Sequence, residues 1–342
     1  MFESLSAVKR PSWRLRFVLA VVSLAVGSVV VSVWRMVEMP LRSYRAPLPA
    51  LNASQLELAA RLANHVRYLS ETIGERNIPH PGSLQKTVEY LHTQLAAQGY
   101  TVTEQAYSID GHKVSNLEAQ LTGAARGEGA IVAGAHYDSA DGTAGADDNA
   151  SGVAALLELA RILREAKLQR TVRFAFFVNE EPPYFQTSAM GSLVYARALH
   201  DERTPIAAMI SLETLGFYSD VPGSQNYPAI LSLFYPSRGN FIGFVANTES
   251  RDLVRRAVRT FREAGQFPSE GVAASSALPG IGWSDHWSFW QFGYPAVMVT
   301  DTAPFRNPYY HRSGDTLEKI DSGKAARVVD GLRAVITSLA NR

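Results

Sequence analysis

The stretch that decides the fold reads AIVAGAHYDSADGTAGADDNASGVAALLELARILREAKLQRTVRFAFFVNEE over residues 130–181. It begins with a continuous apolar run at 130–137, continues as an amphipathic segment at 152–166 and returns to an apolar run at 171–179. Apolar runs of this length predict buried strands, and the apolar spacing between them predicts a helix. A strand, a crossover helix and a second strand are the unit from which parallel sheets are built.

The same alternation extends along the chain on both sides of this stretch. Further strands are expected at 100–107, 113–121, 206–213 and 296–300, and further helices at 54–72, 83–97, 191–200, 251–264 and 323–339. Buried strands that alternate with helices imply a largely parallel sheet covered on both faces. We therefore predict a single α/β domain over residues 54–342, with three αβα layers around a mostly parallel, mixed central sheet.

The amino-terminal part of the chain has a different composition. Residues 17–34 read FVLAVVSLAVGSVVVSVW, and this run of 18 residues without a charge is just long enough to cross a hydrocarbon core as a helix. Four basic residues precede it, namely Lys9, Arg10, Arg14 and Arg16. A basic flank favours a cytoplasmic amino terminus and an exported remainder.

These features predict a membrane protein that crosses the bilayer once. We expect a cytoplasmic tail at 1–16, a transmembrane anchor at 17–37, a linker at 38–53 and an extracytoplasmic domain, on the periplasmic side in a bacterium. The alternative is a cleaved signal peptide. The apolar run is longer than the usual signal core, and no clean small-x-small cleavage site follows it, which favours the anchor.

Composition narrows the functional classes. The formal net charge is +1 over 342 residues, so nothing indicates a nucleic-acid partner. The chain has no cysteine, which excludes disulfides, thiolate zinc fingers and a cysteine nucleophile. Any metal must be bound by histidines and carboxylates, the donors typical of hydrolytic sites with open coordination positions. The oligomeric state stays undetermined at this level.

Polar residues gather directly after the predicted strands, where sites form in open α/β sheets. The polar residues near the strand ends and in the loop before residue 152 are His136, Asp138, Asp147, Asp148, Glu180, Glu181 and Glu213. Tyr310 and His311 come far downstream. Each alone is a weak signal, since surface histidines and helix-capping acids are common. Two histidines and several carboxylates at the strand ends of one sheet, however, are the ligands of a two-zinc site.

The chemistry of such a site accounts for this set of residue types. Two ions about 3.5–4 Å apart need a carboxylate that bridges them, and each needs a terminal histidine and a further carboxylate. A bound water then becomes acidic, with a pKa of about 7. A separate carboxylate must take the proton from that water and pass it to the leaving amine. Adjacent Glu180 and Glu181 can divide these tasks.

From about Leu69 onward, the chain resembles the co-catalytic zinc aminopeptidases of metallopeptidase family 28, a family that also includes glutamate carboxypeptidases and glutaminyl cyclases. The resemblance rests on an ordered set of motifs: His-x-Asp at 136–138, Gly-Ala-Asp-Asp-Asn-Ala-Ser-Gly at 145–152, Asn-Glu-Glu at 179–181, Glu213, Ser-Asp-His at 284–286 and His311. It implies a zinc-exopeptidase-like fold, two Zn²⁺ ions as cofactors and a peptide substrate.

The resemblance also implies a division of the metal ligands. Asp148, directly before Asn149, would bridge the two ions. His136 and Glu213 would bind one ion, and His311 and Glu181 would bind the other.

Three further residues would act beside the metals. The resemblance makes Glu180 the general base and Tyr310 a donor to the tetrahedral oxyanion. Asp138 would hydrogen-bond the far nitrogen of His136, as partners of metal-bound histidines commonly do. The peptide bond between Asp148 and Asn149 is expected to be cis.

Two features depart from the commonest pattern of the family. Many members carry Asp where this chain has Glu213. In addition, Pro182–Gln186 reads PPYFQ and forms a rigid, insertion-like segment after Glu181. Because this segment is expected to shape the pocket wall, side-chain preference cannot be carried over from other members.

Other acids near the motifs have alternative assignments. Asp147 is the rival of Asp148 for the bridging position, although we favour a loop acid at the helix entry. Asp315 is expected to stabilise the loop near His311. Asp285 and His286 lie among tryptophans and phenylalanines, where a role beside the pocket and a buried polar pair in an aromatic core are equally compatible with the sequence.

The function predicted from the sequence is hydrolysis of the peptide bond next to a free amino terminus. Carboxypeptidase or glutaminyl-cyclase-like action on the same scaffold is an alternative, because a fold does not determine its substrate. A second alternative is an inactive, receptor-like or assembly protein. The complete set of ligands argues against that alternative.

Overall fold

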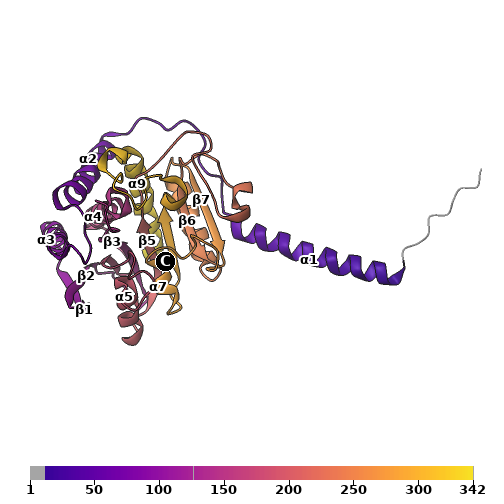
Figure 1. Ribbon diagram of the computed structural model, residues 1–342, viewed down its shortest axis with the longest axis horizontal. Helices are drawn as coiled ribbons and strands as arrows, with labels where there is room; N and C mark the ends of the chain where they lie inside the picture. Colours follow the sequence, from indigo (N-terminus) through magenta and orange to yellow (C-terminus); the bar gives the residue numbers. More distant parts are fainter. Residues whose placement is uncertain (1–11, 126, 342) are drawn as a thin grey trace, which may run out of the picture. The chain divides into compact units, whose positions relative to one another are not determined.

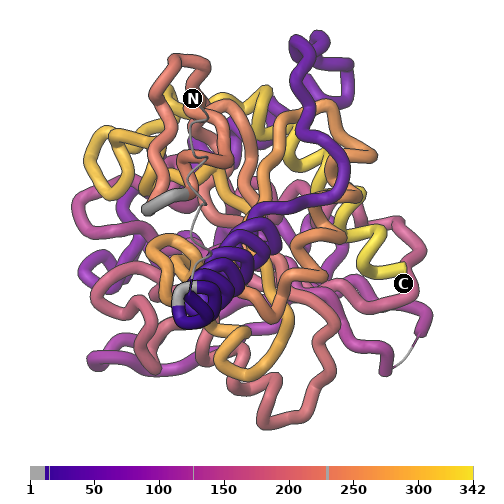
Figure 2. The backbone as a smooth tube through the Cα atoms, turned by 90° about the vertical axis from the view of Figure 1, so that its right-hand side faces the viewer, coloured from indigo at the N-terminus to yellow at the C-terminus, as the bar shows by residue number. Residues whose placement is uncertain are grey.

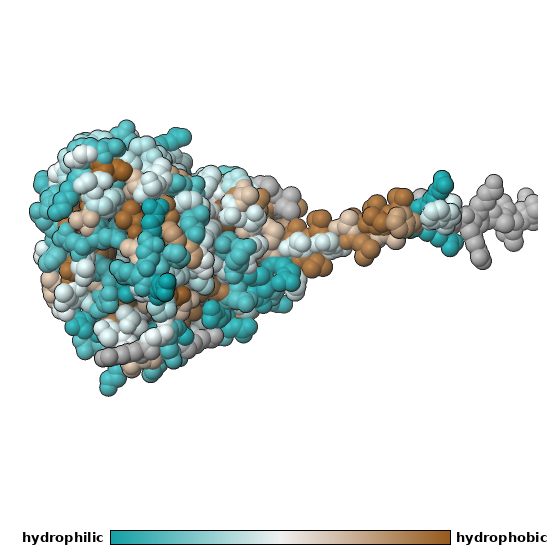
Figure 3. All heavy atoms as spheres, turned by 90° about the horizontal axis from the view of Figure 1, so that it is seen from below, coloured by the Kyte–Doolittle hydropathy of each residue, from teal (hydrophilic) through white to brown (hydrophobic). Residues whose placement is uncertain are grey.

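The structure, a computed structural model, describes residues 12–125 and 127–341. The chain divides into two compact units, Met1–Glu38 and Met39–Arg342. The first contains helix α1 (Trp13–Val37), which begins four residues before the predicted anchor; residues 1–11 of the predicted tail lie outside the described part. Within α1, Arg16–Val37 is long and apolar enough to cross a membrane, a test that a signal sequence also passes. Figure 3 shows this helix in brown, with teal residues toward its amino-terminal end.

The second unit is built on one mixed sheet. Its strands are β1 (Val102–Ile109), β2 (His112–Leu121), β3 (Ala130–His136), β4 (Val172–Phe177), β5 (Ile206–Glu213), β6 (Ile242–Asn247), β7 (Ser269–Ala274) and β8 (Ala296–Thr300). They lie in the order β1-β2-β4-β3-β5-β8-β6-β7 (Figure 1). The central pairs β4-β3, β3-β5 and β5-β8 are parallel, as is the outer pair β6-β7. Pairs β1-β2, β2-β4 and β6-β8 are antiparallel, so the predicted mostly parallel, mixed sheet is confirmed.

Helices cover both faces of this sheet. They are α2 (Ala53–Arg67), α3 (Pro81–Ala97), α4 (Gly152–Leu163), α5 (Gly191–Asp201), α6 (Arg251–Ala264), α7 (His286–Trp290), α8 (Ala303–Arg306) and α9 (Ser322–Ala340). Along β4, Phe174 and Phe176 pack into the core shared with α2, α3, α4, α6 and α9, whereas Ala175 and Phe177 pack toward α5 and α7. Successive side chains of a strand point to opposite faces, which explains why this central strand is apolar at nearly every position.

The predicted strands and long helices are present in the structure. Strands β6 and β7 and the short helices α7 and α8 were not predicted. The β7 sequence SEGVAA is rich in small and polar residues, which have little intrinsic preference for strands, so it depends on its pairing with β6. The predicted helix at 54–72 is α2 followed by a π-helical turn at Tyr68–Ile73.

The segment that follows α1 in the chain belongs to the second unit and lies along the β7 edge. Arg262, at the end of α6, donates to the carbonyl oxygens of Pro40 and Leu41, both at 3.0 Å. The backbone N–H of Ser269, which opens β7, donates to Ser43 Oγ at 2.9 Å. In Figure 2 the indigo tube of this segment runs beside the orange tube of the region that contains α6 and β7.

Candidate metal centre

The parallel strands bring the predicted site residues to one edge of the sheet. β3 ends on His136 and β5 ends on Glu213, while Glu180 and Glu181 follow β4. Because β3, β4 and β5 are mutually parallel, their carboxyl ends lie at the same edge. The turn Ala146–Ser151, in which Asp148 and Asn149 have non-helical backbone angles, carries Asp148 to this edge directly before α4.

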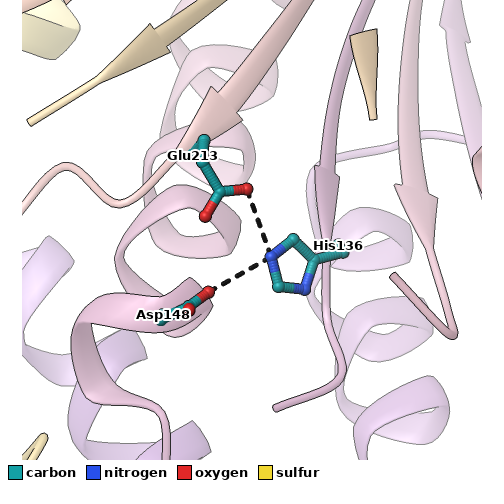
Figure 4. A group of neighbouring side chains, drawn as sticks. All are labelled: His136, Asp148 and Glu213. Carbon is teal, nitrogen blue, oxygen red and sulfur yellow. Dashed lines mark ion pairs between the residues drawn. The ribbon is translucent and has the colours of Figure 1, made fainter. Parts of the chain in front are cut away.

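Asp148 lies between two groups of side chains. Its Oδ1 is 3.3 Å from His136 Nε2, and the same nitrogen is 3.3 Å from Glu213 Oε2 (Figure 4). Its Oδ2 is 3.1 Å from His311 Nε2, which is also 3.1 Å from Glu181 Oε2. The five residues predicted as metal ligands therefore meet, and their donor atoms form two groups of three that share Asp148, while a third group of His136, Glu180 and Glu181 includes the predicted base.

The donor atoms of this cluster are suited to a cation. His136 Nε2, Asp148 Oδ1, Glu181 Oε1 and His311 Nε2 are buried without a hydrogen-bond partner among the described residues. A buried polar atom without a partner is costly, and a bound metal ion removes that cost when the unpaired atoms are imidazole nitrogens and carboxylate oxygens. The residues present thus fit zinc.

The electrostatics of the cluster support the same conclusion. Burial, together with the neighbouring Asp148 carboxylate, raises the pKa of Glu181 to about 8. Burial also raises the pKa of Glu180 well above its usual range, with Glu213 and Glu181 adding to the effect. Burial alone would lower the pKa of His311, but the adjacent carboxylates of Asp148 and Glu181 raise it to about 10. These carboxylates lie too close together to be ionised without added positive charge.

Two predicted neighbours of the metals lie at this site. Asp138 Oδ1 is 3.5 Å from His136 Nδ1, and the two Asp138 oxygens accept the backbone N–H groups of Glu180 and Glu181 at 3.2 and 3.1 Å. Asp138 therefore holds the turn that carries the two glutamates, whereas His136 Nδ1 has no hydrogen-bond partner among the described residues and the predicted hydrogen bond to Asp138 is not formed. Tyr310 stacks on His311, with ring centroids 3.9 Å apart.

The two adjacent acids Asp147 and Asp148 have different surroundings. Asp147 accepts hydrogen bonds from Gly216 N and Asn307 Nδ2, both at 2.9 Å, and lies outside the two ligand groups. This agrees with its expected position as a loop acid. Asp315 accepts from the backbone N–H groups of Asp147 and Asp148 at 2.8 and 3.1 Å, and so stabilises the loop as expected. The peptide bond between Asp148 and Asn149 is cis, as the resemblance implied.

Asp285 and His286 differ in their surroundings. Asp285 is fully buried, burial raises its pKa to about 7, and His136 and Glu213 act on it electrostatically. His286 donates to the Ile281 carbonyl oxygen at 2.7 Å and lies edge-on to Trp290. Asp285 thus belongs with the polar cluster, and His286 belongs with the aromatic core.

Two contributors to the site were missed from the sequence. Ser284 Oγ donates to Glu213 Oε2 at 2.8 Å and so orients this carboxylate. Arg76 is fully buried and donates to backbone carbonyls on both sides of the site, including Tyr137 O at 2.8 Å and Ala144 O at 2.7 Å. The Ser-Asp-His motif contained a signal for Ser284. Arg76 lies in no motif, and no local signal could have found it.

An apolar pocket opens beside the cluster. Its floor is formed by β8, β6 and β7, and it reaches Glu213 and Tyr310 at the metal centre; aromatic and apolar residues in its lining are Tyr227, Leu231, Tyr235, Phe241, Phe244, Trp283 and Phe305. Of the aromatic residues around the Ser-Asp-His motif, Trp283 lines this pocket. Phe289 packs instead in the core under α5 and α7.

The fold and the site define a metallopeptidase of the zinc-exopeptidase type. The model of Peptidase family M28 matches residues 116–336, and the chain belongs to this family. An uncharacterized Escherichia coli protein, YfbL, is 41% identical over 290 residues, which cover 82% of this chain and 87% of that protein.

Two solved structures illustrate the range of activities found on this fold. A zinc aminopeptidase from Bacillus subtilis superposes with a TM-score of 0.66 at 14% identity, covering 83% of this chain and 95% of that structure. A glutaminyl cyclase from Fimbriiglobus ruber superposes with a TM-score of 0.63 at 18% identity, covering 88% of this chain and 99% of that structure. At these identities the likeness establishes the fold, and the reaction must be argued from the site.

Proposed function

We propose that this protein is a two-zinc aminopeptidase. The observation that carries the proposal is the position of Asp148, whose two carboxylate oxygens face different histidine–glutamate pairs. A carboxylate with one oxygen toward each pair is the arrangement that two ions about 3.5–4 Å apart require of a bridging ligand. His136 and Glu213 would hold one ion, and His311 and Glu181 the other.

Bound zinc would supply an acidified water and a Lewis acid for the scissile carbonyl. Glu180 is the residue proposed to take the proton from the water and deliver it to the leaving amine. It lies 3.9 Å from His136 Nε2 and is outside the two ligand groups that share Asp148. A raised pKa suits a general base at neutral pH, because the group can both accept and return a proton.

How the site recognises the amino-terminal residue of the substrate is proposed from the charge and shape of the site. A free α-amine is cationic in solution, so Glu180 and Glu213, both buried and facing the same space, are its proposed acceptors. Tyr310 would donate to the developing oxyanion, and loss of such a donor typically reduces turnover about 10²–10³-fold. The apolar pocket beside Glu213 favours a large apolar first side chain, as in leucyl or phenylalanyl substrates.

The test is a substrate panel measured with the zinc-loaded protein. We expect cleavage of leucyl- and phenylalanyl-amides, no cleavage after amino-terminal acetylation, and a Tyr310→Phe variant with reduced turnover and little change in KM. Equal cleavage of acetylated and free substrates would contradict the aminopeptidase assignment. Release of ammonia from amino-terminal glutamine would instead favour a cyclase, the activity named for the Fimbriiglobus structure. Carboxypeptidase action needs a cation for the substrate carboxylate, and Arg312, the neighbouring candidate, is exposed.

We further propose the predicted topology. The apolar helix would cross the membrane once as an uncleaved anchor, residues 38–53 would link it to the domain, and the peptidase domain at 54–342 would be extracytoplasmic. Support comes from the length and hydropathy of Arg16–Val37 and from the basic residues before it.

A further inference from the structure

The substrate pocket runs across the sheet, from the metal centre to its outer edge. Glu213, Thr300, Gly243 and Glu270 pair in register across β5, β8, β6 and β7, and all four line the pocket. Neighbouring strands are about 4.8 Å apart, so this row extends about 14 Å from the Glu213 backbone to the Glu270 backbone. A short side chain on the amino-terminal residue of a substrate would contact the part of the row near Glu213. A long side chain would approach the part near Glu270.

Gly243 lies in the middle of this row and has no side chain, so it leaves the pocket open there. A Cβ at this position would lie 3.2 Å from the Thr300 carbonyl oxygen and 3.3 Å from Thr302 Cγ2, on the face that lines the pocket. Any side chain here would therefore fill the passage between the inner and outer parts.

The outer end is formed by an edge strand, and the segment after α1 covers that edge. β7 pairs with β6 on one side only, and an uncovered edge strand is prone to fray or to pair wrongly. Ser43 accepts the Ser269 N–H, and Arg262 joins the Pro40 and Leu41 carbonyls to the Ser269 carbonyl.

The same contacts hold the carboxylate that closes the pocket. Arg262 Nη2 lies 3.5 Å from Glu270 Oε2, and Ser43 binds the backbone of Ser269, the residue directly before Glu270. Tyr235, which also lines the pocket, donates from its hydroxyl to the Gly271 carbonyl at 2.7 Å. Removal of Arg262 would free both the edge of β7 and the Glu270 side chain, and removal of Ser43 would free the edge of β7 next to Glu270.

We propose that the segment 39–45, between the apolar helix and the domain, is a structural part of the substrate pocket and that Ser43 and Arg262 are positioning residues for selectivity toward long first side chains. They act through Glu270 and β7, at the end of the pocket far from the metals. The inference rests on the proposed aminopeptidase function and extends it. It assigns to the linker a task beyond tethering.

The experiment measures KM and kcat of the full chain in detergent, with alanyl- and phenylalanyl-4-nitroanilide as substrates. Ser43→Ala should raise KM for the phenylalanyl substrate roughly 5-fold, the effect of one lost hydrogen bond, and Arg262→Met, which loses several contacts, should raise it further. Both should leave KM for the alanyl substrate within about twofold. Gly243→Ala should show the same selectivity by filling the passage. Ser43→Thr, which retains the hydroxyl, should restore the normal KM. Arg42→Ala, an exposed change in the same segment, is the matched control.

The outcomes distinguish failure of the proposed role of segment 39–45 from failure of the aminopeptidase assignment. Equal KM changes for both substrates, or none for either in Ser43→Ala and Arg262→Met, would overturn the inference and leave the aminopeptidase assignment intact. Cleavage of neither substrate by the unaltered zinc-loaded chain would overturn both. Thermal melting of each variant identifies a KM change that arises from general loss of structure, because such a loss would affect both substrates.

Discussion

Individual side chains at the carboxyl edge of the sheet have tasks that depend on which atoms face them. Glu180 and Glu181 are neighbours in sequence, yet Glu181 faces His311 at 3.1 Å and Glu180 lies nearer His136. Asp147 and Asp148 show the same contrast, with one held by backbone and amide donors and the other facing two imidazoles. Adjacent residues of one type can therefore be separated experimentally.

Substitution of the proposed base should separate turnover from metal binding. Glu180→Gln is expected to reduce kcat by about 10²-fold or more, the scale of lost general-base catalysis, because an amide cannot accept the proton of the water. Zinc content, measured by elemental analysis of the same sample, should equal that of the unaltered protein. Full activity in this variant would assign the base to another group.

The two adjacent aspartates offer a matched pair. Asp148→Asn should reduce zinc content to about one ion or fewer per chain, because an amide bridges two cations poorly. Asp147→Asn should retain the metal, since Asp147 lies outside the two ligand groups that share Asp148 and faces Gly216 and Asn307 instead. Equal zinc loss in both variants would contradict the assigned bridge.

At the scale of elements, helices α2 and α4 are joined by a buried ion cluster far from the metals. Glu158, on α4, is fully buried and lies 3.0 Å from Arg61 and 3.1 Å from His65 on α2, and 2.7 Å from Arg161 on its own helix. Burial by itself would raise the pKa of Glu158, but hydrogen bonds from these three partners lower it to about 2. The cluster therefore stabilises the contact between the two helices only while Glu158 is ionised.

This cluster predicts a defined pH dependence of stability. Because the pKa of Glu158 is lower in the folded state than its ordinary value of 4.5, its contribution is complete above pH 4.5 and is lost as the pH falls toward about 2. Glu158→Gln should reduce the free energy of unfolding at pH 7 by roughly 3 kcal/mol, since it removes the ionised carboxylate whose pKa the fold lowers from 4.5 to about 2. Denaturant titrations at pH 7 and pH 3 measure this loss, which should shrink at the lower pH.

The exposed Glu165→Gln, two turns further along the chain, is the control for the helical substitution. It should change stability by less than about 0.5 kcal/mol. A loss of stability in Glu158→Gln that is the same at both pH values would exclude ionisation of Glu158 as its cause.

At the scale of the whole molecule, the apolar helix and the peptidase domain have separate physical tasks. The domain buries its own core in a sheet covered on both faces, whereas the apolar window of α1 has no part buried inside the protein. An apolar surface of this extent requires a nonaqueous environment. The proposed anchor supplies one.

The anchor can be tested by adding charge to the helix. Val22→Arg with Val26→Arg should prevent stable insertion, because each arginine near the centre of a span costs about 2.5–3.5 kcal/mol. The unaltered chain should stay in carbonate-washed membranes with its amino-terminal segment intact, and the double variant should not. Val221→Arg, at an exposed position of the domain, is the control. A released chain that lacks residues 1–37 would identify the segment as a signal peptide.

Much of the fold and the ligand set followed from local sequence. The apolar runs at β3, β4 and β5 are buried on both faces, so their composition alone distinguishes them from other segments. Strand β7 could not be recognised in this way, because SEGVAA becomes a strand only through its pairing with β6. Strand pairing is a tertiary property, and the covered edge and outer end of the pocket depend on it.

For the candidate site, too, some features follow from the sequence and others only from the tertiary structure. The sequence by itself determined which residue types could bind zinc and, from their motifs, that His136, Asp148, Glu181, Glu213 and His311 belong together. Only the tertiary structure decided that Asp148 faces both histidines while Asp147 does not, because neighbouring residues differ only in where the chain directs their side chains. It also decided that Arg76, remote from every motif, supports the site, since its partners are backbone carbonyls that carry no signal in the sequence.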